Sequence, residues 1–194
     1  MKLRRNNFIG KKCYISKDCI LEGGNVINDY VYILEKVILK KNTSVGLRSV
    51  IANLEAGENS IIDCGVLCTG YGDGKIVIGE NTYIGINNIL DWSSDITIGN
   101  FVHIAGPSTG LWTHSSVNMV LKNVNLKNLS SPERYRLPIN IEDNVYIGGN
   151  CTIYPGVTIC NHSIVAPNSV VNKNVEPFTM VGGSPAKFIK NIDI

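Results

Sequence analysis

His114 is the residue best placed for acid–base chemistry, because it lies in a long segment that interrupts an otherwise regular repeat. A histidine poised near neutral pH can take a proton from a hydroxyl or an amine. The other two histidines fall inside the repeat. His103 is expected to point outward in a packing or interface role, and His162 is expected at a solvated corner. Position alone leaves His114 open as a general base or as a structural histidine.

The repeat that surrounds His114 has a period of six residues. Aliphatic side chains recur at this spacing in three runs: Ile9, Ile15, Leu21, Ile27, Ile33, Leu39, Val45 and Ile51; Ile78, Ile84, Leu90, Ile98 and Ile104; and Ile141, Ile147, Ile153, Ile159, Val165 and Val171. A period of six fits neither an amphipathic helix nor an irregular hairpin meander. It is typical of short parallel strands joined by sharp corners, three to a coil. These 19 positions predict an all-β parallel β-helix of about six coils.

Composition limits the class of protein further. The 194 residues carry a net charge of +2, with 44% hydrophobic and 18% charged residues. This balance argues against a disordered segment, an acidic tail protein and a strongly basic nucleic-acid binder. No apolar run reaches the roughly 18–20 residues of a membrane span. The basic start of the chain is not followed by an apolar signal core, so a cytoplasmic location is expected.

The six cysteines do not form the pattern of a metal site or of a disulfide framework. No pair has C-x-x-C spacing, and Cys64 with Cys68 lacks nearby ligands in a matching arrangement. Disulfide frameworks belong to short secreted chains without a sufficient core. Cys13, Cys19 and Cys151 fall on the small inward position of the repeat, where a thiol packs as a compact apolar group. We therefore expect core cysteines and no metal.

Three interruptions break the repeat. Residues 52–77 are expected to hold one irregular coil without assigned chemistry, and residues 91–95 a corner widened by two residues. The third interruption, residues 105–140, contains Trp112, His114 and Tyr135. Loops this long are usually functional or disordered, and its density of apolar residues favours an ordered arm. The chain is thus expected to be a single domain, 1–194, with a protruding loop at 105–140 and a C-terminal cap at 176–194.

Several motifs resemble the left-handed β-helix acyltransferases, in particular the maltose/galactoside O-acetyltransferase branch and its polysaccharide O-acetyltransferase relatives. The resemblance covers residues 76–190. It rests on residues 96–105 (ITIGNFVHIA), Thr113-His114, residues 144–150 (NVYIGGN), residues 169–173 (SVVNK) and residues 181–190 (VGGSPAKFIK). It implies left-handed coils and an acetyl-CoA-dependent homotrimer with active sites between adjacent subunits.

The resemblance also implies roles for individual residues. His114 falls on the family's catalytic histidine. Positions matching the cofactor site are Tyr146, Gly149, Pro167, Asn172, Lys173, Lys187 and Lys190; the last two match basic residues near the phosphates, although ordinary surface charge is the alternative. Asn87 and Asp91 lie near the family's acceptor-binding Asn and Asp, and Trp112 is a candidate platform for a sugar ring. Trp92 and one extra residue shift the register there, so the acceptor does not carry over.

The resemblance implies transfer of an acetyl group to a sugar hydroxyl of a bacterial surface polysaccharide or its precursor, with His114 as general base. Glu133 and a backbone carbonyl are both candidates to orient His114. An N-acetyltransferase acting on a nucleotide-linked amino sugar is the main alternative, and acetylation of an antibiotic is a third. Zinc carbonic anhydrases share the fold, but His103, His114 and His162 lack the close spacing of their ligands. A non-catalytic scaffold is the remaining alternative.

Overall fold

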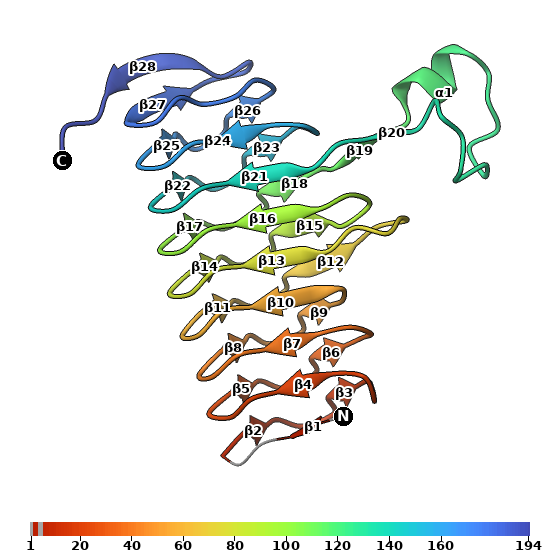
Figure 1. Cartoon of the computed structure of the whole chain (residues 1–194), viewed down its shortest axis with the longest axis vertical. Helices are drawn as coiled ribbons and strands as arrows, with labels where there is room; N and C mark the ends of the chain where they lie inside the picture. The colour runs from red at the N-terminus through yellow and green to blue at the C-terminus, as the bar shows by residue number, and fades with distance from the viewer. Residues whose placement is uncertain (1, 4–5) are drawn as a thin grey trace.

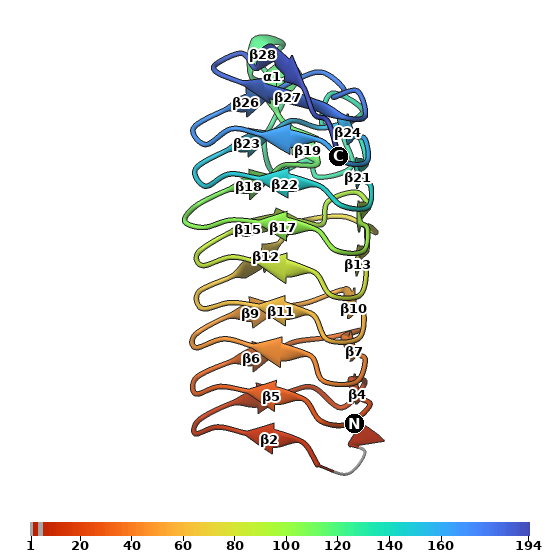
Figure 2. The same ribbon diagram turned by 90° about the vertical axis from the view of Figure 1, so that its left-hand side faces the viewer.

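A computed structural model, which describes residues 2–3 and 6–194, forms a three-sided column of stacked coils. Figures 1 and 2 show the N-terminal coils at one end of the column and the C-terminal strands at the other. Each coil contributes one strand to each of three sheets, here named A, B and C. The chain passes from A to B to C and back to A, which creates an A–B edge, a B–C edge and a C–A edge.

The short strands are stacked in chain order within each sheet. Sheet A contains β1 (Lys2–Leu3), β4 (Ile20–Leu21), β7 (Ile38–Leu39), β10 (Leu54–Ala56), β13 (Ile76–Ile78), β16 (Ile96–Ile98), β21 (Ile139–Ile141) and β24 (Thr158–Ile159). Sheet B contains β2 (Phe8–Ile9), β5 (Val26–Ile27), β8 (Ser44–Val45), β11 (Ile61–Ile62), β14 (Tyr83–Ile84), β17 (His103–Ile104), β22 (Tyr146–Ile147), β25 (Ile164–Val165), β27 (Thr179–Gly182) and β28 (Lys187–Asn191). Sheet C contains β3 (Tyr14–Ile15), β6 (Tyr32–Ile33), β9 (Val50–Ile51), β12 (Leu67–Thr69), β15 (Ile89–Asp91), β18 (Gly110–Leu111), β23 (Thr152–Ile153) and β26 (Val170–Val171).

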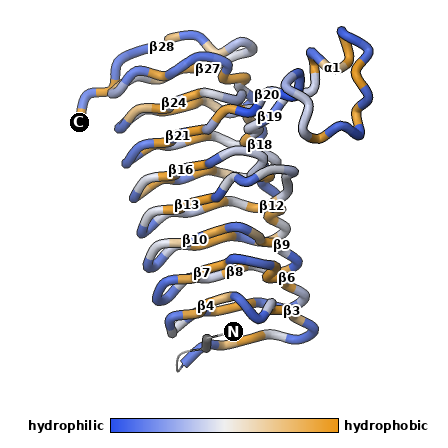
Figure 3. Tube along the Cα trace, turned by 45° about the vertical axis from the view of Figure 1, so that its right-hand side comes forward, coloured by the Kyte–Doolittle hydropathy of each residue, from blue (hydrophilic) through white to orange (hydrophobic). Residues whose placement is uncertain are grey.

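The aliphatic positions of the repeat form the core of this column. Every predicted position from Leu21 onward is at most 2% exposed. Ile9 is 39% exposed, because its strand β2 is the first of sheet B and has no coil beneath it. Figure 3 shows hydrophobic strand segments alternating with more hydrophilic corners along the column. The predicted all-β parallel β-helix is confirmed.

The corners explain the abundance of asparagine. A sharp turn between two faces needs a residue in the left-handed region, which Asn tolerates better than most residues. Positive φ angles of 48–59° occur at these asparagines: Asn42, Asn53, Asn59, Asn81, Asn87, Asn144, Asn150 and Asn168. Each of these residues turns the chain without adding a bulky side chain at the bend.

The first interruption is more regular than the sequence suggested. Residues 52–77 contain a full coil, with β10, β11 and β12 each in its sheet. Ala56, Ile62 and Cys68 occupy the buried positions at 0%, 0% and 5% exposure. The repeat was hidden because Ala and Cys replace the larger aliphatics and one corner is a residue shorter. The true insertion is Gly70–Lys75, between β12 and β13, and the described column is taller than six coils.

The protruding arm is shorter than the predicted 105–140. Leu111 is a fully buried core residue, and its strand β18 pairs with β15 below and β23 above. The chain leaves the column only after Trp112 and returns at β21. The arm consists of the antiparallel pair β19 (His114–Ser115) and β20 (Tyr135–Arg136), with helix α1 (Val117–Leu121) in the connection beyond it. Figure 1 shows this arm extending away from the column.

The C-terminal segment closes the upper end of sheet B. β27 pairs parallel with β25, and β28 then pairs antiparallel with β27. Of the three cysteines predicted to be core residues, Cys19 and Cys151 are buried, each 1% exposed. Cys13 is only partly buried, because it belongs to the first coil. Within the described ranges, no helix is long and apolar enough to cross a bilayer.

Candidate active site

His114 is positioned where the arm leaves the column on the C–A edge. It is the first residue of β19, and it lies opposite Arg136 of β20 in the antiparallel register. Two strands therefore fix its backbone, although the rest of the arm projects outward. The His114 side chain is 22% exposed, so the ring is held by the protein and one edge of it remains accessible.

Asp91 is the hydrogen-bond partner of the His114 ring. The His114 Nδ1 atom lies 2.6 Å from Oδ2 of Asp91, which is the last residue of β15 in the coil below. A carboxylate at this distance accepts the Nδ1 proton, and this leaves Nε2 as the acceptor nitrogen. The ring is thus oriented, and its tautomer fixed, in the way a general base requires.

The Asp91 carboxylate is held by several further donors. Ser93 donates from its backbone N and from Oγ to Asp91 Oδ1, at 3.1 and 2.7 Å. Thr113 N donates to Oδ2 at 2.9 Å, and the Asp91 side chain is 1% exposed. Burial acts to raise the pKa of Asp91, but the hydrogen bonds from Ser93 and His114 outweigh it, and the net pKa is lowered. The buried carboxylate is therefore ionised at neutral pH and stabilises a positive charge on His114.

Asp91 was not predicted as the partner of His114. It was predicted to bind the acceptor, but its carboxylate is enclosed by its own chain and hydrogen-bonded to His114. Glu133 was a predicted candidate to orient His114, whereas it accepts a hydrogen bond from Lys122 Nζ at 2.7 Å within the arm. One feature of the sequence could have indicated this role of Asp91. The six-residue spacing lengthens to eight between Leu90 and Ile98, and the widened corner that results holds Ser93 beside Asp91.

A hollow of about 300 Å³ lies beside His114. It is lined by Trp112, the candidate platform for a sugar ring, together with Tyr135 of the arm and Thr152, Tyr154 and Pro155 of the next coil. Aromatic walls with a few hydroxyl groups suit the apolar faces and polar rims of a sugar ring. Asn87, in contrast, is an exposed residue of the B–C edge. Within one chain it lies across sheet C from His114, and it does not share this hollow.

A second hollow, of about 510 Å³, lies on the B–C edge. It brings together three predicted cofactor residues, Tyr146, Gly149 and Pro167. A Cβ atom on Gly149 would lie 2.4 Å from the Gly106 carbonyl oxygen, so no side chain fits there. The hollow is therefore lined by bare backbone at Gly149, which permits close approach of a flexible ligand.

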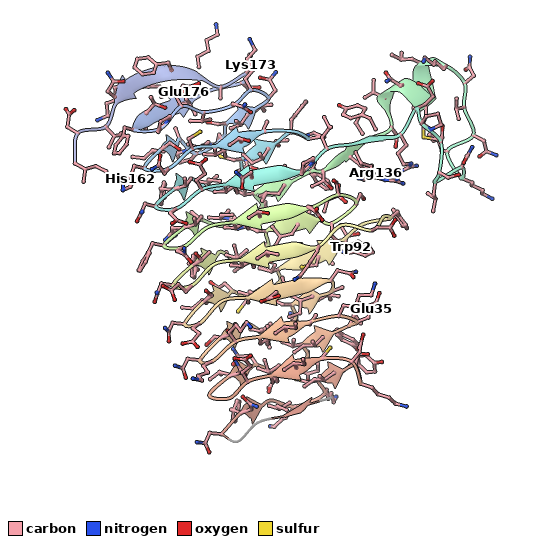
Figure 4. All side chains as sticks on the ribbon, viewed as in Figure 1. Glu35, Trp92, Arg136, His162, Lys173 and Glu176 are labelled. Atoms are coloured by element: carbon pink, nitrogen blue, oxygen red, sulfur yellow. The ribbon has the colours of Figure 1, made fainter. Side chains whose placement is uncertain are left out.

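The other four predicted cofactor residues are exposed near the C-terminal end of the column. Asn172 and Lys173 follow β26, and Lys187 and Lys190 belong to β28. Figure 4 shows Lys173 at this end, far from Glu35. None of the three lysines forms a salt bridge within residues 2–3 and 6–194.

The remaining histidines lie apart from His114. The ring of His103 packs between Tyr83 and Tyr146 on the outer face of sheet B, with centroid distances of 4.7 and 5.3 Å. His162 stacks on Phe178, and Figure 4 shows it on the opposite side of the column from Arg136. In the described part of the chain, no three His, Cys, Asp or Glu side chains gather as metal ligands would.

Comparison with known proteins shows which family the chain resembles. Residues 138–173 match the family model described as bacterial transferase hexapeptide (six repeats). Galactoside O-acetyltransferase of Escherichia coli (strain K12) is 34% identical over 137 residues, which cover 71% of this chain. The matched segment spans 63% of that relative, less than two thirds of its length.

Solved structures extend the comparison to the whole fold. A polySia-specific acetyltransferase, 21% identical, covers 97% of this chain and 86% of its own with a TM-score of 0.64, and this likeness concerns the fold. A hexapeptide-repeat acetyltransferase of Vibrio cholerae O1 biovar eltor, solved with acetyl coenzyme A, is 36% identical with a TM-score of 0.53. The alignment covers 68% of this chain and 73% of that one. With this identity over most of both chains, the protein belongs to the hexapeptide-repeat acetyltransferase family.

Proposed function

We propose that this protein is an acetyl-CoA-dependent O-acetyltransferase that acts in the cytoplasm on a sugar hydroxyl of a bacterial surface polysaccharide or its precursor. The observation that carries the proposal is the Asp91–His114 pair, with a 2.6 Å hydrogen bond, beside an open hollow with aromatic walls. Family membership supports acyl transfer as the reaction. The E. coli relative, which is named a galactoside O-acetyltransferase, supports a sugar as the acceptor.

The proposed reaction is direct transfer between two bound substrates. His114 Nε2 takes the proton of the acceptor hydroxyl while the oxygen attacks the thioester carbonyl carbon. Asp91 stabilises the imidazolium that forms. The tetrahedral intermediate collapses, the carbon–sulfur bond breaks, and the CoA thiolate recovers the proton from His114. The products are an acetyl ester and free CoA.

Two further residues bear on the oxyanion of the intermediate. The backbone amides of Gly148 and Gly149 are the candidates to stabilise it. The Gly148 N–H already donates to the Val165 carbonyl at 2.9 Å, so it is committed to the ladder of sheet B. Gly149 lines the hollow on the B–C edge, and we assign the role to its amide.

The donor is proposed to lie along that B–C hollow. Its bare backbone at Gly149 and its wall at Tyr146 suit the narrow pantetheine arm, and Lys187 and Lys190 are candidates for the CoA phosphates. Within one chain, sheet C separates this hollow from His114. A homotrimer, in which His114 of one subunit faces the donor hollow of its neighbour, would bring the two halves together.

The experiment is an acceptor panel assayed for release of CoA from acetyl-CoA. The panel contains free sugars, nucleotide sugars, nucleotide amino sugars and polysaccharides, and products are tested for lability to hydroxylamine, which cleaves esters and leaves amides intact. An ester product on a hydroxyl acceptor is the predicted result. A product confined to amino sugars and resistant to hydroxylamine would contradict the proposal and establish N-acetyl transfer instead.

A further inference from the structure

Two hollows on the C–A edge are not used by the reaction described above. The upper one, of about 280 Å³, lies between the insertion Gly70–Lys75 and the base of the arm. The lower one, of about 260 Å³, lies on the N-terminal side of the same insertion. Both are lined by Asp73 and Gly74, so the insertion forms their common wall. Figure 1 shows the loop between β12 and β13 projecting on the same side of the column as the arm.

The upper hollow adjoins the catalytic pair. Ser93, which holds the Asp91 carboxylate, lines it together with Ser94 and Asp95. Arg136, the cross-strand neighbour of His114, forms its upper wall. Figure 4 shows Arg136, Trp92 and Glu35 in succession down this edge. A ligand that leaves the His114 hollow toward the N-terminal coils would meet this surface first.

The lower hollow contains an asparagine whose amide has no hydrogen-bond partner among the described residues. Asn53 is 8% exposed and lines the hollow, and its side-chain amide forms no hydrogen bond with the described residues. Its φ of 48° explains why an asparagine suits the corner, and its amide, which lines the hollow, is available to a ligand. Ile20 and Ile38 are half-buried beside it. The hollow thus pairs an apolar surface with an unused donor and acceptor.

The charges on this edge do not suit a diphosphate. Asp18, Asp73 and Asp95 place carboxylates in the two hollows. Of the cations there, Lys75 is paired with Glu55 at 2.8 Å. Arg136 donates from Nη2 to the Leu129 carbonyl, and neither Arg136 nor Lys36 pairs with a carboxylate in the described ranges, so three carboxylates face two unpaired cations. A nucleotide-linked sugar is therefore disfavoured, whereas the hydroxyl groups of a neutral chain can donate to the carboxylates.

The length of the edge exceeds one sugar. From the corner of Asp18 to the arm, the chain rises through five strand steps in sheet A, from β4 to β21. At the usual spacing between strands this is about 24 Å. We propose that the C–A edge from Arg136 to Asp18 is a binding track for an extended glycan, so that the acceptor is a sugar chain of several units and not a single activated sugar. This inference rests on the proposed function, and it commits that function to a polymeric acceptor.

The test is binding of the protein to glycan ladders, each running from a single sugar to chains long enough to span the track. Neutral, acidic and amino-sugar ladders are printed on one array and probed with the His114→Ala protein, which binds without turnover. Asn53→Gly removes the amide and still allows the left-handed corner. Asp73→Ala removes the carboxylate shared by both hollows. Asn81→Gly is the matched control, because Asn81 is an exposed left-handed asparagine on the A–B edge.

We expect binding to strengthen with chain length on at least one ladder. Asn53→Gly and Asp73→Ala should each weaken binding of the longest chains about fivefold or more, the effect of one lost hydrogen bond, and leave the shortest member unchanged. Asn81→Gly should match the parent. Binding that is independent of length on every ladder, no binding to any chain, or variants that bind long chains as the parent does would each overturn the track. Because no acetyl transfer is measured, these results are independent of whether O-acetylation itself is correct.

Discussion

The C–A and B–C edges of the column are built from the same repeat and yet differ in almost every feature. The C–A edge carries the insertion Gly70–Lys75, the widened corner at 91–95 and the whole arm. The B–C edge keeps short corners except for the one between Ile104 and Leu111, which is a single residue longer, and its hollow is lined by Gly149 and Pro167. The C–A edge contains buried hydrogen bonds around Asp91. The B–C edge, in contrast, has no side chain at Gly149. In this chain the proposed catalytic groups thus lie on lengthened corners, and the proposed donor hollow lies where a glycine leaves the backbone bare.

Asp91→Asn should produce the largest effect, because it removes the charge that orients and stabilises His114. We expect kcat for acetyl transfer to fall about 100-fold or more, with little change in the KM for acetyl-CoA. Asp63→Asn is the matched control on the B–C edge, where the Asp63 carboxylate accepts a hydrogen bond from Tyr83 Oη. If Asp91→Asn kept more than half of the wild-type kcat, the catalytic role of the C–A edge would be wrong.

Gly149→Val tests the B–C edge. Even a Cβ atom would lie 2.4 Å from the Gly106 carbonyl oxygen, so the new side chain would displace Gly106 and Pro107, which line the proposed donor hollow. We expect the affinity for CoA, measured by calorimetry, to weaken about tenfold or more, which corresponds to roughly 1.4 kcal/mol. Acceptor binding should not change. An unaltered CoA affinity in a folded Gly149→Val protein would place the donor elsewhere.

The pH dependence of stability tests the Asp91 network without activity. The pKa of Asp91 is lowered in the folded state, so its contribution is present above the unfolded value of about 3.9 and is lost as pH falls through the folded pKa. Wild type should exceed Asp91→Asn by about 2 kcal/mol in the free energy of unfolding at pH 7. Urea titrations should show this gap closing below about pH 4. A gap that is constant with pH would exclude an ionised, hydrogen-bonded Asp91.

Glu133→Gln should have the smallest effect. Glu133 pairs with Lys122 within the arm and forms no hydrogen bond or ion pair with His114 in the described part of the chain. Exposed ion pairs contribute little, so we expect kcat within about twofold of wild type and no measurable change in stability. Steady-state kinetics beside Asp91→Asn would check this. If kcat of Glu133→Gln fell as much as kcat of Asp91→Asn, Glu133 and not Asp91 alone would orient His114.

The sequence predicted the fold well because one feature, a six-residue aliphatic period, determines it. Every position from Leu21 onward that fits the period is buried. The coil expected at 52–77 was predicted to be irregular, because Ala56 and Cys68 are small core residues that the period does not distinguish. The arm was predicted to begin too early, at residue 105. Leu111 is a core residue, but it follows Ile104 by seven residues instead of six, because the corner between them is one residue longer.

The candidate site was only partly predictable. His114 stood out because it lies off the repeat, and Gly149 and Pro167 followed from the family resemblance. The role of Asp91 as the partner of His114 could not be predicted in this way. The contact between β15 and β19 depends on how two irregular corners stack. Asn53 and Asp73 carry no motif at all. Only the stacking of coils brings them to one edge with His114.

The measurement that tests the account most directly is kcat for acetyl transfer by His114→Ala, on the acceptor that the panel identifies and at saturating acetyl-CoA. His162→Ala is the control, because His162 stacks on Phe178 away from the arm. We predict that His114→Ala loses about 100-fold or more, the scale of a lost general base, while CoA affinity and the activity of His162→Ala stay near wild type. Full activity in His114→Ala would contradict the mechanism, even though the β-helix would stand.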